Sequence, residues 1–455
     1  MRETLKFWGY GPDVESECVG DNRLLGPACP PSDLVTKFGH IKYSAVGAKL
    51  LPDFKTQLYD MLGFVRFAEQ IPASADSVVT FSPLDGSGDL ELVSVDADQN
   101  YVFHFDLDKT IRYVEQEEFL SPSVPMYVQL GISPESLPAS VRKFILFSFG
   151  ISRNLSKTLK PRPQFPKAGK DFFVDSWRFL IRAILQQSGY GNGSPLWPDD
   201  KQAVLTLNHD VDTAWSLTND DGVKAFRTIE EELGLRSAWI AVACLHEIGK
   251  GAFLKLKGAG HEIGCHGTVH DHSIAYLQEQ EILDRLESAR DFLEQYECVG
   301  FRSPSYHHSP ALFKCLDRYF EYDMSMHDSF ENANSPFPSY EGCSTCFPFY
   351  LDGTGVLQIP TTITEDFVLE MLGHGPDETI NIQIEQINQV TARYGVANLL
   401  THPEPELSAR RPWRDAYQEV ISEMVGRDDL WIALPREISA WWRSRSEKIE
   451  QAWDL

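Results

Sequence analysis

The sequence predicts an α/β protein whose C-terminal part is a barrel of seven or eight parallel strands and whose N-terminal part is a smaller α+β domain. From about residue 203 onward, short apolar strands alternate with amphipathic helices, which is typical of a parallel sheet with helical crossovers. Before that point, three short segments alternate apolar and polar residues around polar turns, which is typical of an antiparallel meander. We expect an N-terminal domain of residues 1–195 and a barrel domain of residues 196–455.

The length and composition of the chain agree with two globular domains. At roughly 150 residues per domain, a chain of 455 residues exceeds what one hydrophobic core usually serves. Its formal net charge of -25 repels polyanions, so we expect no nucleic acid partner. We find neither a secretory signal nor the ~18 uninterrupted apolar residues of a membrane span, so we expect a cytoplasmic protein without such a span.

The N-terminal domain contains the expected meander and two expected helices. The strands are expected at 77–81, 90–95 and 101–107. The helices are expected at 134–153 and 171–187. The basic, proline-rich stretch 157–170 between them is typical of a linker or a surface segment.

The barrel domain contains eight candidate strands separated by helices. The strands are expected at 204–207, 238–244, 262–265, 298–301, 322–325, 356–359, 396–400 and 430–433. The helices include 222–234, 276–296, 309–319, 377–394 and 413–426. Seven or eight such units within about 250 residues suit a barrel better than an open sheet.

The residues that follow the predicted barrel strands are unusually polar. In parallel α/β folds, ligands bind where the strands end, so these positions indicate where chemistry takes place. Asp210 and Asp212 follow the first strand, and His266 and His270 follow the third. Further polar residues hold corresponding places, namely Arg302 to Tyr306 after the fourth strand, Asp323 in the fifth and His402 after the seventh.

These carboxylates and imidazoles are the ligand types of a catalytic divalent metal site. Such a site needs about three nitrogen or oxygen ligands and an open position for water. His266 and His270, four residues apart, can face the same way, and Asp210 and Asp212 point to the same side of an extended strand. A bound ion would lower the pKa of its water towards ~7 and polarise an acyl carbonyl.

The cysteines indicate neither a disulfide framework nor a thiolate metal site. The eight cysteines are spread along the chain, several of them in apolar strand-like runs, as is typical of reduced core residues. Cys343 and Cys346 have CxxC spacing, but no second pair completes a four-thiolate zinc site. We interpret 343–346 as a structural loop.

Taken in order, the polar segments resemble the motifs of the polysaccharide deacetylase family, also called the NodB-homology or chitin deacetylase-like family, over residues 200–445. The family's first motif, Thr-Phe-Asp-Asp, corresponds to 209–212, and its second, His-Ser/Thr-x-x-His, to 266–270. The third, Arg-x-Pro, corresponds to 302–306, and the fifth, Leu-x-His, to 400–402. The resemblance implies a distorted (β/α) barrel. The fourth motif, Asp-x-x-Asp-Trp, is not present as such, and 322–328 occupies its place.

The resemblance also implies roles for the site residues. One carboxylate is the general base and the other a metal ligand, and we assign Asp210 as base and Asp212 as ligand, although the departure from adjacent carboxylates leaves these roles exchangeable. His266 and His270 complete the ligand set. Arg302 keeps the base ionised, and the backbone N–H near Tyr306 binds the oxyanion. His402 protonates the leaving amine, and Asp323 is our choice of partner for His402. We place His209 with Tyr306 on the substrate side.

The expected activity is hydrolysis of an N-acyl group, an N-acetyl group in the first place, from an amino sugar or glycan precursor. Zinc is the expected cofactor, with nickel, cobalt and manganese as alternatives, because Asp-His-His sites accept several ions. A second interpretation is an amidohydrolase of a cyclic amide or ureide, since the resemblance extends to allantoinases, which are often metal-free. A third is a glycan-binding protein with a degenerate barrel, because the first and fourth motifs are altered.

Overall fold

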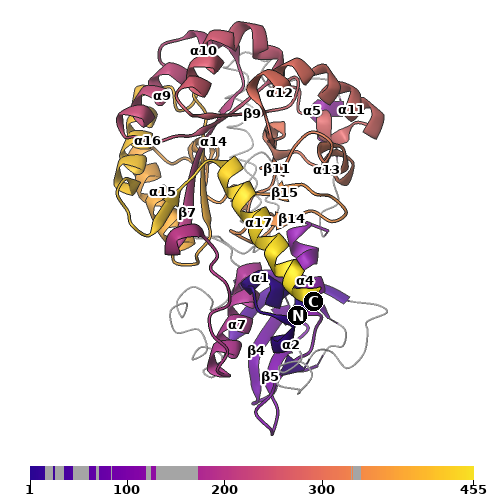
Figure 1. The fold of residues 1–455 in the computed structure, drawn as a ribbon. Helices are drawn as coiled ribbons and strands as arrows, with labels where there is room; N and C mark the ends of the chain where they lie inside the picture. The colour runs from indigo at the N-terminus through magenta and orange to yellow at the C-terminus, as the bar shows by residue number, and fades with distance from the viewer. Residues whose placement is uncertain are drawn as a thin grey trace.

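The computed structural model describes residues 1–15, 24–25, 35–44, 61–67, 71–83, 85–118, 124–129, 173–328, 330–331 and 340–454. Within these ranges the chain forms a barrel surrounded by helices and a smaller sheet with helices packed against it (Figure 1). The boundary that we propose at residues 195 and 196 falls in the connection between helix α7 and strand β7. None of the described helices is both long enough and apolar enough to cross a membrane.

The N-terminal sheet has six strands in the order β1-β6-β5-β4-β2-β3. They are β1 (Leu24–Leu25), β2 (Val35–Tyr43), β3 (Met61–Phe67), β4 (Ser77–Pro83), β5 (Leu90–Val95) and β6 (Tyr101–Phe103). Neighbours are antiparallel except for β1 and β6. The predicted meander is confirmed as β4, β5 and β6, but β6 ends early because Asp106 caps a helix that starts at Leu107.

Helices from both ends of the N-terminal part pack around this sheet. They are α1 (Arg2–Trp8), α2 (Pro12–Glu15), α4 (Leu107–Glu115) and α7 (Phe173–Gln187). The short helix α5 (Met126–Gln129) is drawn away from this sheet, in the region of α11 and α12 (Figure 1). Helix α7 confirms the prediction at 171–187, and its Trp177 packs on Phe105 with ring centroids 4.8 Å apart. The helix expected at 134–153 and the proline-rich stretch 157–170 lie outside the described residues.

The second sheet is the predicted barrel. Its order is β14-β15-β11-β10-β9-β8-β7-β16, and β17 also pairs with β7. The strands are β7 (Ala203–Val211), β8 (Ala238–Ala241), β9 (Glu262–Cys265), β10 (Gly300–Phe301), β11 (Tyr322–Asp323), β14 (Phe349–Tyr350), β15 (Leu357–Gln358), β16 (Val396–Thr401) and β17 (Leu430–Ile432). Every pair is parallel except β14 with β15, so all eight predicted strands are confirmed.

The barrel closes irregularly between β15 and β16. No ladder joins these two strands among the described residues. Instead, the segment after β15 reaches β16 through the Ile363 N–H, which donates to the Asn398 carbonyl at 3.2 Å. The Thr362 hydroxyl donates to the Val396 carbonyl at 2.7 Å. The structure is therefore a distorted barrel, as predicted.

Helices surround the barrel and connect successive strands (Figure 1). They are α8 (Ala214–Thr218), α9 (Val223–Glu232), α10 (His246–Gly258), α11 (Glu279–Ser288), α12 (Arg290–Tyr296), α13 (Pro310–Leu316), α14 (Asp366–Met371), α15 (Pro376–Thr391), α16 (Arg411–Met424) and α17 (Pro435–Trp453). The single helix expected at 276–296 is two helices, because the chain breaks at Ala289.

Several contacts join the N-terminal part to the barrel, and two of them lie at α17 and at α7. Helix α17 runs from the barrel to α1, where the Trp453 indole N–H donates to the Tyr10 carbonyl at 3.0 Å (Figure 1). On α7, the buried Asp175 accepts hydrogen bonds from the Thr345 hydroxyl at 2.6 Å and from the Cys346 N–H at 2.9 Å. The CxxC segment is thus a structural loop, as predicted, with Cys343 and Cys346 both free and buried.

Candidate metal centre and active site

Asp212, His266 and His270 meet at the carboxyl ends of β7 and β9, the two strands that flank β8. Asp212 follows β7, and His266 follows β9 directly. The Asp212 Oδ1 atom lies 3.3 Å from His266 Nε2 and 3.4 Å from His270 Nε2. Among the described residues, these three form the one group of side chains whose ligand atoms lie within 4.8 Å of one another, close enough to share an ion.

The environment of this group fits a cation. Asp212 Oδ1 is buried and accepts no hydrogen bond. The His266 Nδ1 atom lies 2.9 Å from the Arg302 carbonyl, which only accepts, so Nδ1 carries a hydrogen and Nε2 is the ring nitrogen that faces Asp212. Burial raises the pKa of Asp212, but His270 and His266 outweigh it and leave the pKa below its ordinary value. Asp212 is therefore ionised, as a metal ligand needs, and two imidazole nitrogens face its carboxylate.

Asp210 lies beside the metal group and is held by a buried arginine. Arg302 donates from Nη1 to Asp210 Oδ1 at 2.7 Å and from Nη2 to the Asn208 side-chain oxygen at 2.6 Å. The other Asp210 oxygen lies 3.6 Å from His266 Nε2 and 4.0 Å from His402 Nε2. Asp210 in β7 and Asp212 directly after it therefore face one site, as the alternation along an extended strand predicts.

His402 reaches the site from the end of β16 and is paired with Asp366. Its Nδ1 atom lies 2.7 Å from Asp366 Oδ1, and its backbone N–H donates to Asp366 Oδ2 at 2.9 Å. Burial lowers the pKa of His402, but Asp366 outweighs burial and raises the pKa well above 6.5. His402 is thus held in its charged form, able to donate a proton from Nε2.

The expected pairing of Asp323 with His402 is wrong. Asp323 lies within β11, fully buried, and accepts hydrogen bonds from the Ser325 hydroxyl at 2.6 Å and from the Gln358 amide at 2.5 Å. These bonds tie β11 to β15 and leave Asp323 in the sheet. Asp366, the first residue of α14, occupies the position beside His402 instead.

The expected place of His209 on the substrate side is also wrong. Because side chains alternate along β7, His209 points away from the side that carries Asp210 and Asp212. It is fully buried, with Nε2 2.6 Å from Glu230 and Nδ1 2.8 Å from the Thr401 hydroxyl. Its ring packs on Trp239 with centroids 4.2 Å apart. His209 therefore belongs to a polar cluster behind the site.

Tyr306 lies at the site, but its backbone amide does not fit the expected oxyanion role. The Tyr306 N–H donates to the Ser303 carbonyl at 3.0 Å and closes a tight turn. The Tyr306 hydroxyl instead donates to Glu365 at 2.9 Å. Burial raises the pKa of Glu365 to about 7.

Sequence reasoning missed three acidic residues near the site, namely Glu365, Asp366 and Glu404. Glu404 accepts from the backbone N–H groups of Asp212 and Thr213 at 3.0 and 3.1 Å, and so fixes the turn that carries Asp212. The positions of these three residues in the sequence could have pointed to them. Glu365 and Asp366 stand together between a strand and a helix, and Glu404 comes two residues after His402.

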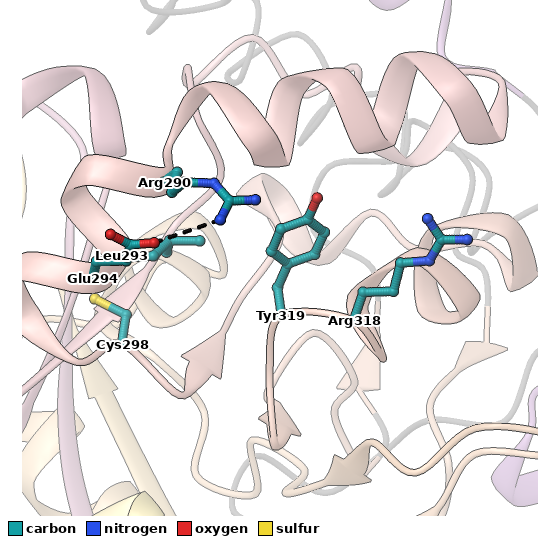
Figure 2. Close-up of a pocket in the computed structure, with 6 residues that line it drawn as sticks. All are labelled: Arg290, Leu293, Glu294, Cys298, Arg318 and Tyr319. Atoms are coloured by element: carbon teal, nitrogen blue, oxygen red, sulfur yellow. Dashed lines mark ion pairs between the residues drawn. The ribbon is translucent and has the colours of Figure 1, made fainter.

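A surface hollow elsewhere on the barrel has no part in this site. Figure 2 shows it lined by Arg290, Leu293, Glu294, Cys298, Arg318 and Tyr319, with an ion pair between Arg290 and Glu294. Cys298 precedes β10, and Tyr319 precedes β11, so the hollow lies at the amino ends of the strands. The metal group lies at the opposite ends.

Comparisons with known proteins find similarity among solved structures. No protein-family model matches the chain, and no curated protein matches it. A Mycobacterium smegmatis protein assigned as a polysaccharide deacetylase matches with a TM-score of 0.46 and 21% identity, over 56% of this chain and 94% of that one. An allantoinase matches with a TM-score of 0.46 and 15% identity, over 56% and 95%. The Bacillus subtilis peptidoglycan deacetylase PdaC, in a mutant form, matches with a TM-score of 0.36 and 12% identity, over 56% and 99%. These similarities concern the fold alone.

Proposed function

We propose that this protein is a metal-dependent hydrolase that removes an N-acyl group, an acetyl group in the first place, from an amino sugar or glycan precursor. One observation carries the proposal: Asp212, His266 and His270 converge beside Asp210, Arg302 and His402 at the carboxyl ends of the barrel strands. This set combines candidate metal ligands with an ionised carboxylate and a charged imidazole. Hydrolysis of an amide needs these chemical types together.

Asp212, His266 and His270 are the residues that would hold the metal. A divalent ion there, zinc in our proposal, would supply a water of lowered pKa and polarise the acyl carbonyl. His266 is oriented for ligation by the Arg302 carbonyl, and Asp212 by Glu404 through its own backbone N–H. The ligands therefore come from a preorganised frame.

Asp210 is the proposed general base. Arg302 donates a charge-assisted hydrogen bond to Oδ1, which favours the ionised carboxylate and leaves Oδ2 towards the site. From there Oδ2 can accept the proton of an attacking water. Arg302 is fully buried and also bound to Asn208, so it holds Asp210 in one orientation.

His402 is the proposed general acid. Its Nδ1–H is held by Asp366, and its Nε2–H lies on the side of Asp210. Because Asp366 keeps the ring charged, His402 can deliver a proton to the leaving nitrogen as the carbon–nitrogen bond breaks. The acid and the base thus come from the carboxyl ends of two different strands, β16 and β7.

The experiment that tests the proposal compares metal-free and metal-loaded protein. The purified chain is stripped with a chelator, reloaded with zinc, cobalt, nickel or manganese, and assayed for acetate release from N-acetylated amino sugars. We expect no activity without metal and recovery with at least one ion. Asp212→Asn should stay inactive, whereas Asp220→Asn, at an exposed carboxylate, should behave as the unmodified protein.

Two other outcomes would contradict the proposal. Activity on cyclic ureides but not on N-acetyl sugars, independent of metal, would favour the second interpretation, an amidohydrolase that acts on a cyclic amide or ureide. Binding of glycans without hydrolysis and without stoichiometric metal would favour a binding protein with a degenerate barrel.

A further inference from the structure

We propose that Glu117, in the N-terminal part of the chain, is a positioning residue for the active site. It acts through His308 on the segment 302–308, which we call the Arg302 loop and which carries Arg302 and Tyr306. This inference rests on the proposed function for its catalytic consequence. It also assigns a role to the N-terminal part, which belongs to neither the barrel nor the metal group.

The contact between Glu117 and His308 is a buried ion pair that continues into the loop backbone. His308 Nε2 lies 2.6 Å from Glu117 Oε2, and His308 Nδ1 lies 2.8 Å from the Tyr306 carbonyl. The Glu117 side chain is only 4% exposed, and that of His308 is 19% exposed. Because a carboxylate and a carbonyl both accept, both ring nitrogens must donate, so the geometry requires a charged imidazole.

The Arg302 loop needs such a support because its backbone is strained at two residues. Ser305 and Tyr306 both adopt positive φ, at 55° and 57°, a region that L-residues avoid unless the surroundings hold them there. The Nδ1 atom of His308 donates a hydrogen bond directly to the carbonyl of Tyr306. On its other side, the loop is held by the Ser305 hydroxyl, 2.7 Å from His272 Nδ1. Through Glu117 and His308, the N-terminal part therefore contributes to one of the side-chain anchors next to the strained pair.

Movement of this loop would disturb several groups of the site at once. The Arg302 carbonyl fixes the ring of His266, and the Arg302 guanidinium holds Asp210. The Tyr306 hydroxyl binds Glu365, the neighbour of Asp366 in the chain. A small displacement at Tyr306 thus reaches the metal group and the base through the loop backbone and the hydrogen bonds of Arg302, and the acid through Glu365 and Asp366.

The charges around His308 favour its charged form. Burial lowers the pKa of His308, but the negative charges of Glu117 and Asp323 raise it. The resulting pKa of His308 is about 9. The adjacent His307 stays neutral at neutral pH, because burial lowers its pKa to about 4. Below about pH 9 both hydrogen bonds of His308 form, and above that pH the neutral ring keeps only one donor.

The test uses the full-length protein with Glu117→Gln, His308→Gln and the double variant. The matched control is Asp352→Asn, which removes an exposed ion pair between α4 and the barrel but leaves the Arg302 loop untouched. Hydrogen exchange of residues 302–309 reports the loop directly, without any need for activity. Rates of the metal-loaded enzyme, measured at pH 6 and at pH 8, report the catalytic consequence.

We expect Glu117→Gln to speed exchange in the loop by about 10-fold or more while the barrel strands stay protected. At pH 8 it should lower kcat by roughly 10- to 100-fold with little change in KM, because the reacting groups are misplaced. The defect should be smaller at pH 6 than at pH 8, because a larger fraction of His308 carries a proton on both ring nitrogens at the lower pH. The double variant should be no worse than the single ones, and the control should match the unmodified protein within about 2-fold.

Unchanged exchange and an unchanged kcat in Glu117→Gln at pH 8 would overturn the proposal, as would an equal loss in the control. If Glu117→Gln fails to fold, His308→Gln tests the same pair from the barrel side. If the unmodified protein shows no hydrolysis but Glu117→Gln still loosens the loop, the proposed function fails while the support role stands.

Discussion

Asp212 has a buried carboxylate oxygen that accepts no hydrogen bond, facing two imidazole nitrogens. A buried acceptor left in this way costs about 1–3 kcal/mol, and more when it is charged. The neighbouring Asp210 has no such deficit, because Arg302 donates to it. The difference between two carboxylates only two residues apart supports our assignment of Asp212 as ligand and Asp210 as base.

Loss of a ligand residue should abolish metal retention without unfolding the chain. We expect His266→Ala to bind metal more than about 100-fold more weakly, since even changes around metal ligands cost roughly 10–100-fold. Metal content after gel filtration, together with circular dichroism, measures both effects. Metal retention equal to that of the unmodified protein would contradict the ligand set.

Asp366→Asn should change the pH dependence of hydrolysis. His402 is a proton donor only below its pKa, so activity falls as pH rises through that pKa. Removing the Asp366 charge lowers the pKa of His402, so the alkaline limb of the kcat profile should move to lower pH. We expect kcat to fall by roughly 100- to 10,000-fold at neutral pH.

The control for this prediction is Asp377→Asn, an exposed acid in the first turn of the next helix, α15. It should leave the pH profile unchanged. An alkaline limb at the same pH in Asp366→Asn and the unmodified protein would show that His402 is not the titrating acid.

Sequence reasoning found most site residues that stand at strand ends, and it missed Asp366, which lies farther from a strand. Asp210, Asp212, His266 and Arg302 stand within two residues of a strand end, where the parallel pattern predicts a site. Asp366 stands at the start of a helix, eight residues after β15, so no strand pattern pointed to it. His209 was misplaced because adjacency in sequence was given more weight than the alternation of side chains.

At the scale of elements, the turn after β7 depends on Glu404. Its carboxylate binds the backbone N–H groups of Asp212 and Thr213 and the Thr213 hydroxyl. We expect Glu404→Gln to weaken metal binding by about 10- to 100-fold, because the turn that presents Asp212 loosens. Competition with a chromogenic chelator measures the affinity, and Glu419→Gln, exposed on α16, is the control. Equal affinities in both variants would rule out this positioning role.

Strand β10 depends on the absence of a side chain at Gly300. A Cβ atom there would overlap the ring of Tyr322 on the neighbouring strand β11. That ring cannot move easily, because its buried hydroxyl donates to Glu262 at 2.6 Å. We expect Gly300→Ala to lower the free energy of unfolding by roughly 1–3 kcal/mol. Urea unfolding measures this, with Gly251→Ala, where nothing lies within 4 Å, as control.

Most strands and helices of the barrel were predictable because their apolar and polar residues alternate clearly along the sequence. The helices that were predicted wrongly or not at all have physical reasons. All eight predicted strands form because each is a short apolar run between polar turns. The expected helix 276–296 is interrupted because α11 ends at Ser288 and α12 starts at Arg290. Helix α10 was not expected, because its two internal glycines weaken the helical signal.

At the scale of the whole molecule, one buried arginine contacts both parts of the chain. Arg178 on α7 donates to Glu115 of α4 at 2.6 Å and to the Thr345 hydroxyl of the barrel at 3.2 Å. Both partners of the ion pair are at most 9% exposed. Such contacts join residues far apart in sequence, and no local pattern predicts them. Strands β1, β2 and β3 of the N-terminal sheet were not expected either, because no local sequence pattern pointed to them.

Arg178→Met should destabilise the joined molecule. Removal of one partner leaves Glu115 buried without its counter-charge, which costs about 3–5 kcal/mol. Thermal unfolding measures the change, with Arg112→Met, half of an exposed ion pair, as control. A loss in Arg178→Met no larger than in the control would show that this buried pair contributes little to stability.

The central claim is that one metal ion binds to atoms from two separate strand ends. Anomalous X-ray scattering from crystals loaded with zinc, collected on both sides of the zinc edge, tests it most directly. We predict one strong peak bonded to Asp212, His266 and His270, with Asp210 and His402 on either side of its open face. A peak elsewhere, or none in contact with these three side chains at saturating zinc, would contradict the account.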